Sequence, residues 1–129
     1  MQKLMWLALA GAAGTLARYG LGGLVQRWAP SEAGSAIFPW GTLAVNVLGC
    51  FLFGLVWSLG TERMAISAEL RTIILIGFMG AFTTFSSFAG ETSRLMAEGQ
   101  WLYAGGNILL QNITGIAAMF VGYAAGRAI

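Results

Sequence analysis

Four long apolar stretches, separated by short polar segments, run through the whole chain. A helix needs about 20 apolar residues to cross the hydrocarbon core of a bilayer, and each stretch reaches that length. The pattern predicts an all-α membrane protein with one four-helix transmembrane domain. We expect its helices over residues 4–25, 37–59, 68–98 and 101–126.

Prolines and glycines mark the connections between these helices. Pro30 follows the first stretch, and Pro39 stands near the start of the second, where a missing N–H costs little. Residues 60–67 form a turn, and Gly99 is a stop signal for the third helix. Connections this short leave no room for a domain outside the membrane.

The third stretch carries an unusual segment, GFMGAFTTFSSFAGE, over residues 77–91. Irregular backbone at membrane depth is tolerated only where it is buried in protein or lines a cavity. The glycines and hydroxyls predict a helix break near 80–84, with Gly80 permitting unusual dihedral angles. Unwound carbonyl oxygens suit a hard cation such as sodium, so this segment is a candidate ion site.

Composition supports a membrane protein and excludes several other classes. Of 129 residues, 57% are hydrophobic and only 9% are charged, against about a quarter in soluble domains. The mean hydropathy is +0.74. A net charge of +2 is too small for a nucleic-acid partner. With no histidine, one cysteine (Cys50) and five carboxylates, the chain offers no credible catalytic constellation, so we expect no enzyme.

The positive charges give only a weak orientation signal. Four cations fall on one predicted side of the membrane (Lys3, Arg63, Arg71, Arg127) and two on the other (Arg27, Arg94). One fixed orientation and insertion both ways therefore remain open, and the second would permit an antiparallel homodimer. Small residues on one face of the first and fourth helices predict close packing: Gly11, Gly14, Gly22, Gly115, Ala118, Gly122 and Gly126.

Two polar residues stand inside the first two stretches. Arg18 either attracts anions to a vestibule or pairs with a carboxylate, because a charge at that depth faces protein or water. Asn46 either hydrogen-bonds to a neighbouring helix or offers its NH₂ group to an anion. In the fourth stretch, Asn107, Gln111 and Thr114 share one face, as a wettable track or as a contact between subunits.

Two phenylalanines follow the predicted break. Phe85 and Phe88 are three residues apart and share a helix face, with Thr84, Ser86 and Ser87 around them. The edge of a phenyl ring is positive, so a buried edge can receive an anion without offering a full charge. The alternative is that both rings pack in the core or against lipid.

The segments GTLAVN (41–46) and GFMGAFTTFSSF (77–88) closely resemble the Fluc (CrcB) fluoride channels, whose corresponding pieces read GTLxxN and GxxGGxTTFSTFS. The likeness covers the whole chain, including Arg18 and Glu91. It implies a passive fluoride-selective channel of the bacterial inner membrane that relieves fluoride toxicity. It also implies an antiparallel dual-topology homodimer with two separate pores.

The resemblance assigns roles to individual residues. Phe85 and Phe88 match the pore phenylalanines, and Asn46 matches the pore asparagine. Gly80 and Thr83 match residues whose backbone carbonyls hold a central sodium ion.

The rest of the predicted pathway is also carried over from the family, with departures. Ser86 and Ser87 fall in the hydroxyl-rich run, and Gln111 falls where the family places a polar residue. Ser87 replaces a threonine, Ala81 replaces a glycine, and two serines are lost, at Ala89 and Gly115.

Two other functions compete with the channel. A proton-coupled exporter resembling the small multidrug-resistance transporters needs a carboxylate in its first membrane helix, and this first helix has only Arg18 as a deep charge. A non-transporting assembly subunit needs only the small-residue faces, and it leaves the Phe, Ser, Thr and Asn pattern unexplained.

Overall fold

A computed structural model describes residues 1–29, 38–62 and 66–129. Over these residues the chain forms four helices, as the sequence predicts, with the third divided into several pieces. The first is α1 (Gln2–Trp28), the second α2 (Trp40–Thr61) and the fourth α6 (Trp101–Ala128). The third consists of α3 (Ala68–Thr72), the π-helix η1 (Ile73–Met79), α4 (Gly80–Phe82) and α5 (Phe85–Ala97).

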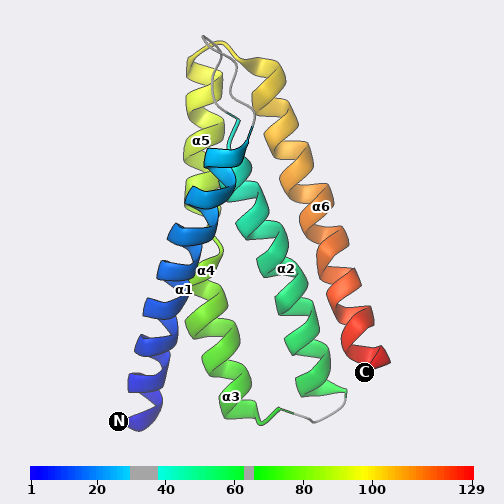
Figure 1. The fold of residues 1–129 in the computed structure, drawn as a ribbon. Coiled ribbons are helices and arrows are strands. Elements are labelled where there is room, and N and C mark those ends of the chain that lie inside the picture. Colours follow the sequence, from blue (N-terminus) through cyan, green and yellow to red (C-terminus); the bar gives the residue numbers. More distant parts are fainter. Residues whose placement is uncertain (30–37, 63–65) are drawn as a thin grey trace.

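The four helices form an elongated bundle with both termini at the same end (Figure 1). Helix α2 packs chiefly against α6, while α1 packs against η1, α4 and α2. The predicted loop at Pro30–Ser35, the predicted start of the second helix at Ile37, and Arg63 lie outside the described residues.

Three of the helices are long and apolar enough to cross a membrane: Trp40–Thr61, Ala68–Ala97 and Trp101–Ala128. At 27 residues, α1 is longer than α2, but it is not among these three. Arg18 and the glycines of α1 lower its hydropathy. By length and composition, the described residues therefore contain three candidate spans.

Small residues allow the helices to approach closely. A Cβ atom added to Gly122 would lie 1.9 Å from the Phe51 carbonyl oxygen, and one on Gly54 would lie 2.2 Å from that of Met119. On α1, Gly14 approaches the Phe78 carbonyl oxygen in the same way, at 2.3 Å. The predicted packing role of the small-residue faces is confirmed, since Gly14, Gly115, Gly122 and Gly126 are all buried.

A small apolar core lies where α1, α2 and the third helix meet. Its buried members are Val45, Leu75, Met79 and Phe82. Most of the remaining apolar surface stays exposed, with fewer than a third of the residues of each apolar span buried. This exposed apolar surface can face lipid tails or a second protein chain. The bilayer core contains no water, so the surface does not have to be buried inside one chain.

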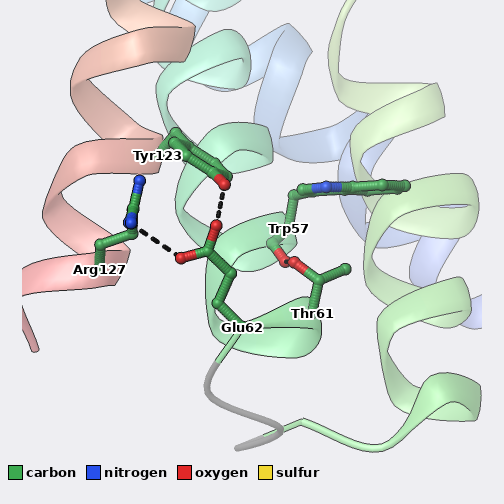
Figure 2. A network of polar contacts seen from close by, with 5 residues as sticks. All are labelled: Trp57, Thr61, Glu62, Tyr123 and Arg127. Carbon is green, nitrogen blue, oxygen red and sulfur yellow. Dashed lines mark hydrogen bonds and ion pairs between the residues drawn. The ribbon is translucent and has the colours of Figure 1, made fainter.

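Polar contacts join the ends of α2 and α6 (Figure 2). Glu62 accepts a hydrogen bond from the Tyr123 hydroxyl, and its other oxygen lies 2.9 Å from Arg127 Nε. The Arg127 guanidinium also lies over the Tyr123 ring, 5.8 Å from its centroid. This cluster fixes the last turn of α6 against the end of α2.

We expect Glu62→Gln to lower the melting temperature of the purified protein by a few degrees. The loss is small because the Arg127 side chain is 61% exposed, and exposed ion pairs contribute no more than about 1 kcal/mol. Thermal unfolding in detergent measures it. The control is Glu98→Gln, which removes only the long, exposed Arg94–Glu98 pair and should leave the melting temperature unchanged. Equal melting temperatures for the two variants would contradict the role of Glu62.

Candidate functional site

The third helix is interrupted at Thr83 and Thr84, whose backbones are extended (φ −82°, ψ 160° and φ −152°, ψ 114°). Thr84 is the N-cap of α5, and its hydroxyl oxygen accepts a hydrogen bond of 3.1 Å from the Ser87 amide. Threonine at an N-cap favours this arrangement, because the hydroxyl satisfies an amide at the start of the helix. The motif TTFSS therefore ends one helix and begins another.

The expected conformational role of Gly80 is wrong. Its backbone is helical (φ −60°, ψ −32°), so the break makes no use of the dihedral freedom of glycine. The interruption lies at Thr83 and Thr84, at the end of the predicted interval of 80–84. Before the break, and separated from it by the short α4, η1 widens the helix into a π-helix, a feature that often accompanies functional sites.

Asn46 holds the interrupted backbone from the middle of α2. Its Oδ1 atom accepts a 2.8 Å hydrogen bond from the Thr84 amide, and its Nδ2 donates to the Thr84 carbonyl at 3.1 Å. The same Nδ2 donates to Gln111 Oε1 on α6 at 3.0 Å. One side chain therefore connects three helices at the point where the third is broken.

The break also releases backbone carbonyl oxygens, those of Gly80 and Thr83 among them. In a continuous α-helix, the amides of Thr84 and Ser87 would bond to the carbonyls of Gly80 and Thr83. Here the Thr84 amide bonds to Asn46 and the Ser87 amide bonds to the Thr84 hydroxyl. The Gly80 and Thr83 oxygens are left without their usual helical donors.

An open cavity of ≈ 270 Å³ lies beside the break. Its polar walls come from Asn46, Thr83, Thr84, Gln111 and Asn112, and its apolar walls from Gly49, Cys50, Phe53, Phe85, Phe88 and Met119. We call it the phenylalanine cavity. The Phe85 and Phe88 rings are tilted by 59° with their centroids 5.5 Å apart, and Phe85 is 78% exposed.

A second cavity, of ≈ 410 Å³, lies on the α1 side of the break, and we call it the arginine cavity. Arg18, Thr42 and Glu91 line it together with Thr84 and Ser87. The Thr42 hydroxyl donates a 2.7 Å hydrogen bond to Glu91 Oε1. Thr84 lines both cavities, so the capping residue is the wall between them.

Arg18 forms no ion pair with any residue that the structure describes. It is half-buried and lines the same cavity as Glu91. Of the two roles left open by the sequence, the geometry favours the cavity-lining one over a fixed pair with a carboxylate.

The predicted hydroxyl residues are divided between the two sides. Thr84 is buried, while Ser86 and Ser87 are exposed on the first turn of α5. The Thr84 hydroxyl donates to Ser87 Oγ at 3.0 Å and lies 3.3 Å from Ser86 Oγ. Ser87 lines the arginine cavity, and neither serine lines the phenylalanine cavity.

The predicted polar face of α6 separates into different environments. Asn107 and Gln111 are buried, whereas Thr114 is half-buried and its hydroxyl donates to Leu110 of its own helix. Asn107 Nδ2 donates to Thr92 Oγ1 on α5 at 2.9 Å. Thr92 was not predicted from the sequence. It lies one turn after Phe88, and its hydroxyl donates to the Phe88 carbonyl at 2.7 Å.

These features define a small helical membrane protein whose polar site is built around a broken helix. Comparison with known proteins is more specific. The profile of the family described as "CrcB-like protein, Camphor Resistance (CrcB)" matches residues 5–123. The chain belongs to this family.

Relatives are similar over their full lengths. The fluoride-specific ion channel FluC of Nitrosococcus oceani is 52% identical over 128 residues, covering 99% of this chain and 98% of the relative. The fluoride-specific ion channel FluC of Solidesulfovibrio magneticus is 53% identical over 129 residues, covering 100% and 99%. That of Nitratidesulfovibrio vulgaris is 52% identical over 133 residues and covers both chains completely.

Proposed function

We propose that this chain is a fluoride-specific ion channel that lets fluoride leave the bacterial cell passively and so relieves fluoride toxicity. The observation that carries this conclusion is the identity of about half of all residues, over the whole chain, to channels of that description. A channel performs no covalent chemistry, so the protein is not an enzyme. It is a multi-pass membrane protein of the bacterial cell membrane.

The two cavities meeting at Thr84 support a route for the ion. Arg18 and the hydroxyl-rich start of α5 lie on one side, where a positive charge attracts anions. On the other side, Phe85 and Phe88 offer positive ring edges, and Asn46 and Gln111 offer amides. Ser86, Ser87 and Thr114 contribute hydroxyls at the margins of this route. Donors and ring edges together replace the water around a small, strongly hydrated anion.

A second, antiparallel copy of the chain completes the channel in this proposal. Phe85, which is 78% exposed beside the phenylalanine cavity, would then face protein instead of lipid. In this arrangement α1 is the fourth span. Its 27 residues reach about 40 Å at 1.5 Å each, and it packs along the third helix and α2, which both cross the membrane.

The released carbonyls of Gly80 and Thr83 fit a sodium ion, which prefers oxygen ligands. A sodium ion bound there would place a fixed positive charge at the helix break. Two copies of the chain would provide four such oxygens around one ion. Asn46 and the Thr84 cap keep these oxygens free of helical hydrogen bonds.

An efflux assay tests the proposed function. Purified protein in liposomes loaded with both fluoride and chloride should release the fluoride and retain the chloride, as followed by ion-selective electrodes. Protein-free liposomes provide the control. Equal release of both ions would refute selectivity, and release of neither would refute the channel.

A further inference from the structure

We infer that Gln26 is a positioning residue for the ion path: from α1 it caps the start of α2, and so holds Thr42 against Glu91 at the arginine cavity. Gln26 lines this cavity, and no role was predicted for it from the sequence. The inference rests on the proposed function. It concerns the side of the helix break that carries Arg18.

The start of α2 has no cap of its own. Its N-cap residue, Pro39, makes no side-chain hydrogen bond, and the first turn contains no acidic residue. The first amides of a helix have no carbonyl partner within it, and a buried amide must find an acceptor elsewhere. Gly41 is the second residue of α2 and is buried. Its amide therefore needs an acceptor from another part of the chain.

Gln26 supplies this acceptor from the last turn of α1. Its Oε1 atom accepts a 3.0 Å hydrogen bond from the Gly41 amide, and its Nε2 donates to the Phe38 carbonyl at 3.0 Å. A backbone amide can only donate and a backbone carbonyl can only accept, so the orientation of this carboxamide is fixed. Helix α1 ends and α2 begins at the same end of the bundle (Figure 1). One side chain therefore ties α1 to both sides of the start of α2.

The backbones of the two helices are in close contact beside this cap. A Cβ atom added to Gly41 would lie 2.4 Å from the Gly22 carbonyl oxygen, and one added to Gly22 would lie 3.6 Å from Val45 Cγ2. Gly22 is four residues before Gln26, so the two lie on the same face of α1. Backbone contact and hydrogen bonds therefore both restrict the first turn of α2 against α1.

The position of this turn determines one wall of the arginine cavity. Thr42 follows Gly41 directly, and its hydroxyl donates a 2.7 Å hydrogen bond to Glu91 Oε1 on α5. Gln26, Thr42 and Glu91 all line the cavity, as does Arg18. The contacts of Gln26 and Thr42 thus join α1 to α2 and α2 to α5 around one space. A rotation of the first turn of α2 would move the Thr42 hydroxyl away from Glu91, in the wall that an anion passes.

Gln26→Met tests this role, because methionine is close to glutamine in length and removes both hydrogen bonds without adding charge. We expect it to reduce fluoride efflux from liposomes about fivefold, the scale of one neutral hydrogen bond. Thr42→Val removes the hydrogen bond to Glu91 and should give a similar loss. The matched control is Gln2→Met, since Gln2 is exposed and lines neither of the two cavities. It should conduct like the wild type.

The double variant distinguishes positioning from simple stabilisation. If Gln26 acts through Thr42, adding Gln26→Met to Thr42→Val costs little more, and the double variant also loses about fivefold. If the two residues act independently, the losses multiply to about 25-fold, and the inference is overturned. Wild-type flux in either folded single variant would overturn it as well. Failure of the wild-type protein itself to pass fluoride would refute the proposed function, and this inference with it.

Hydrogen exchange tests the cap in the wild-type protein, whether or not a variant folds. Carbonyl-labelled tryptophan and ¹⁵N-labelled glycine identify the Gly41 amide through the unique Trp40–Gly41 pair. The comparison is Leu102, the second residue of α6, whose N-cap Gln100 makes no side-chain cap hydrogen bond. Relative to intrinsic rates, Gly41 should exchange at least about fivefold more slowly, and folded Gln26→Met protein should lose this difference. Equal protection of both amides in the wild type would overturn the inference.

Discussion

Asn46→Asp is expected to reduce fluoride efflux at least about 30-fold in protein that still folds. Aspartate keeps an oxygen for the Thr84 amide, but its second oxygen faces the Thr84 carbonyl and Gln111 Oε1, which are both acceptors. Two hydrogen bonds are therefore lost. Each buried acceptor that is left unpaired costs about 1–3 kcal/mol. Since about 1.4 kcal/mol corresponds to tenfold, the lower end of about 2 kcal/mol for two unpaired acceptors corresponds to a loss of about 30-fold.

The measurement is fluoride efflux from liposomes, with size-exclusion chromatography and thermal unfolding to establish that the variant folds. The control is Glu98→Gln, because Glu98 lies in an exposed pair with Arg94 and lines neither of the two cavities. It should conduct within about threefold of the wild type. Near-normal flux in folded Asn46→Asp protein would remove Asn46 from the pathway and from the support of the break.

The helices and their close packing were predictable because their signals are local. Apolar length predicted the segments, and small residues at helical spacing predicted the buried faces that contain Gly14 and Gly122. Both signals depend on general requirements of a bilayer and of close helix contact. The weaker hydropathy of α1 also has a local cause, since Arg18 lies inside it.

The position of the break was not fully predictable from local sequence. Glycine suggested Gly80, but Gly80 is helical and the interruption lies at Thr83 and Thr84. Asn46, 38 residues earlier in the chain, takes the Thr84 amide away from the helix. A long-range hydrogen bond of this kind leaves no periodic pattern in the sequence. The TTFSS capping motif is visible in the sequence. It indicates the position of the helix break only when the contact between Asn46 and Thr84 is known.

The polar contacts of α6 show the same limit. Asn107, Gln111 and Thr114 share a face by spacing, yet only the first two are buried against other helices. The partner of Asn107 is Thr92, which sequence spacing alone did not single out. The contacts depend on how α5 and α6 come together after the break.

Gly122→Ala is expected to destabilise the packed bundle and lower its melting temperature. The added Cβ would lie 1.9 Å from the Phe51 carbonyl oxygen and 2.8 Å from its carbon, and these backbone atoms cannot rotate away as a side chain can. Helices α2 and α6 would have to separate along the most extensive contact of the fold. Overpacking of this kind typically costs about 1–3 kcal/mol, and here it exceeds the gain of about 1 kcal/mol that alanine brings to a helix.

A series of three glycines on α6 tests this explanation. Gly105 has no atom within 4 Å of an added Cβ, and Gly115 meets only Cys50 Sγ, at 3.5 Å. Thermal unfolding and size-exclusion chromatography should show Gly105→Ala as stable as the wild type or more stable, and Gly115→Ala close to it. Gly122→Ala should have the lowest melting temperature of the three variants. If all three behaved alike, helix propensity would outweigh contact distance, and the proposed basis of the α2–α6 contact would be wrong.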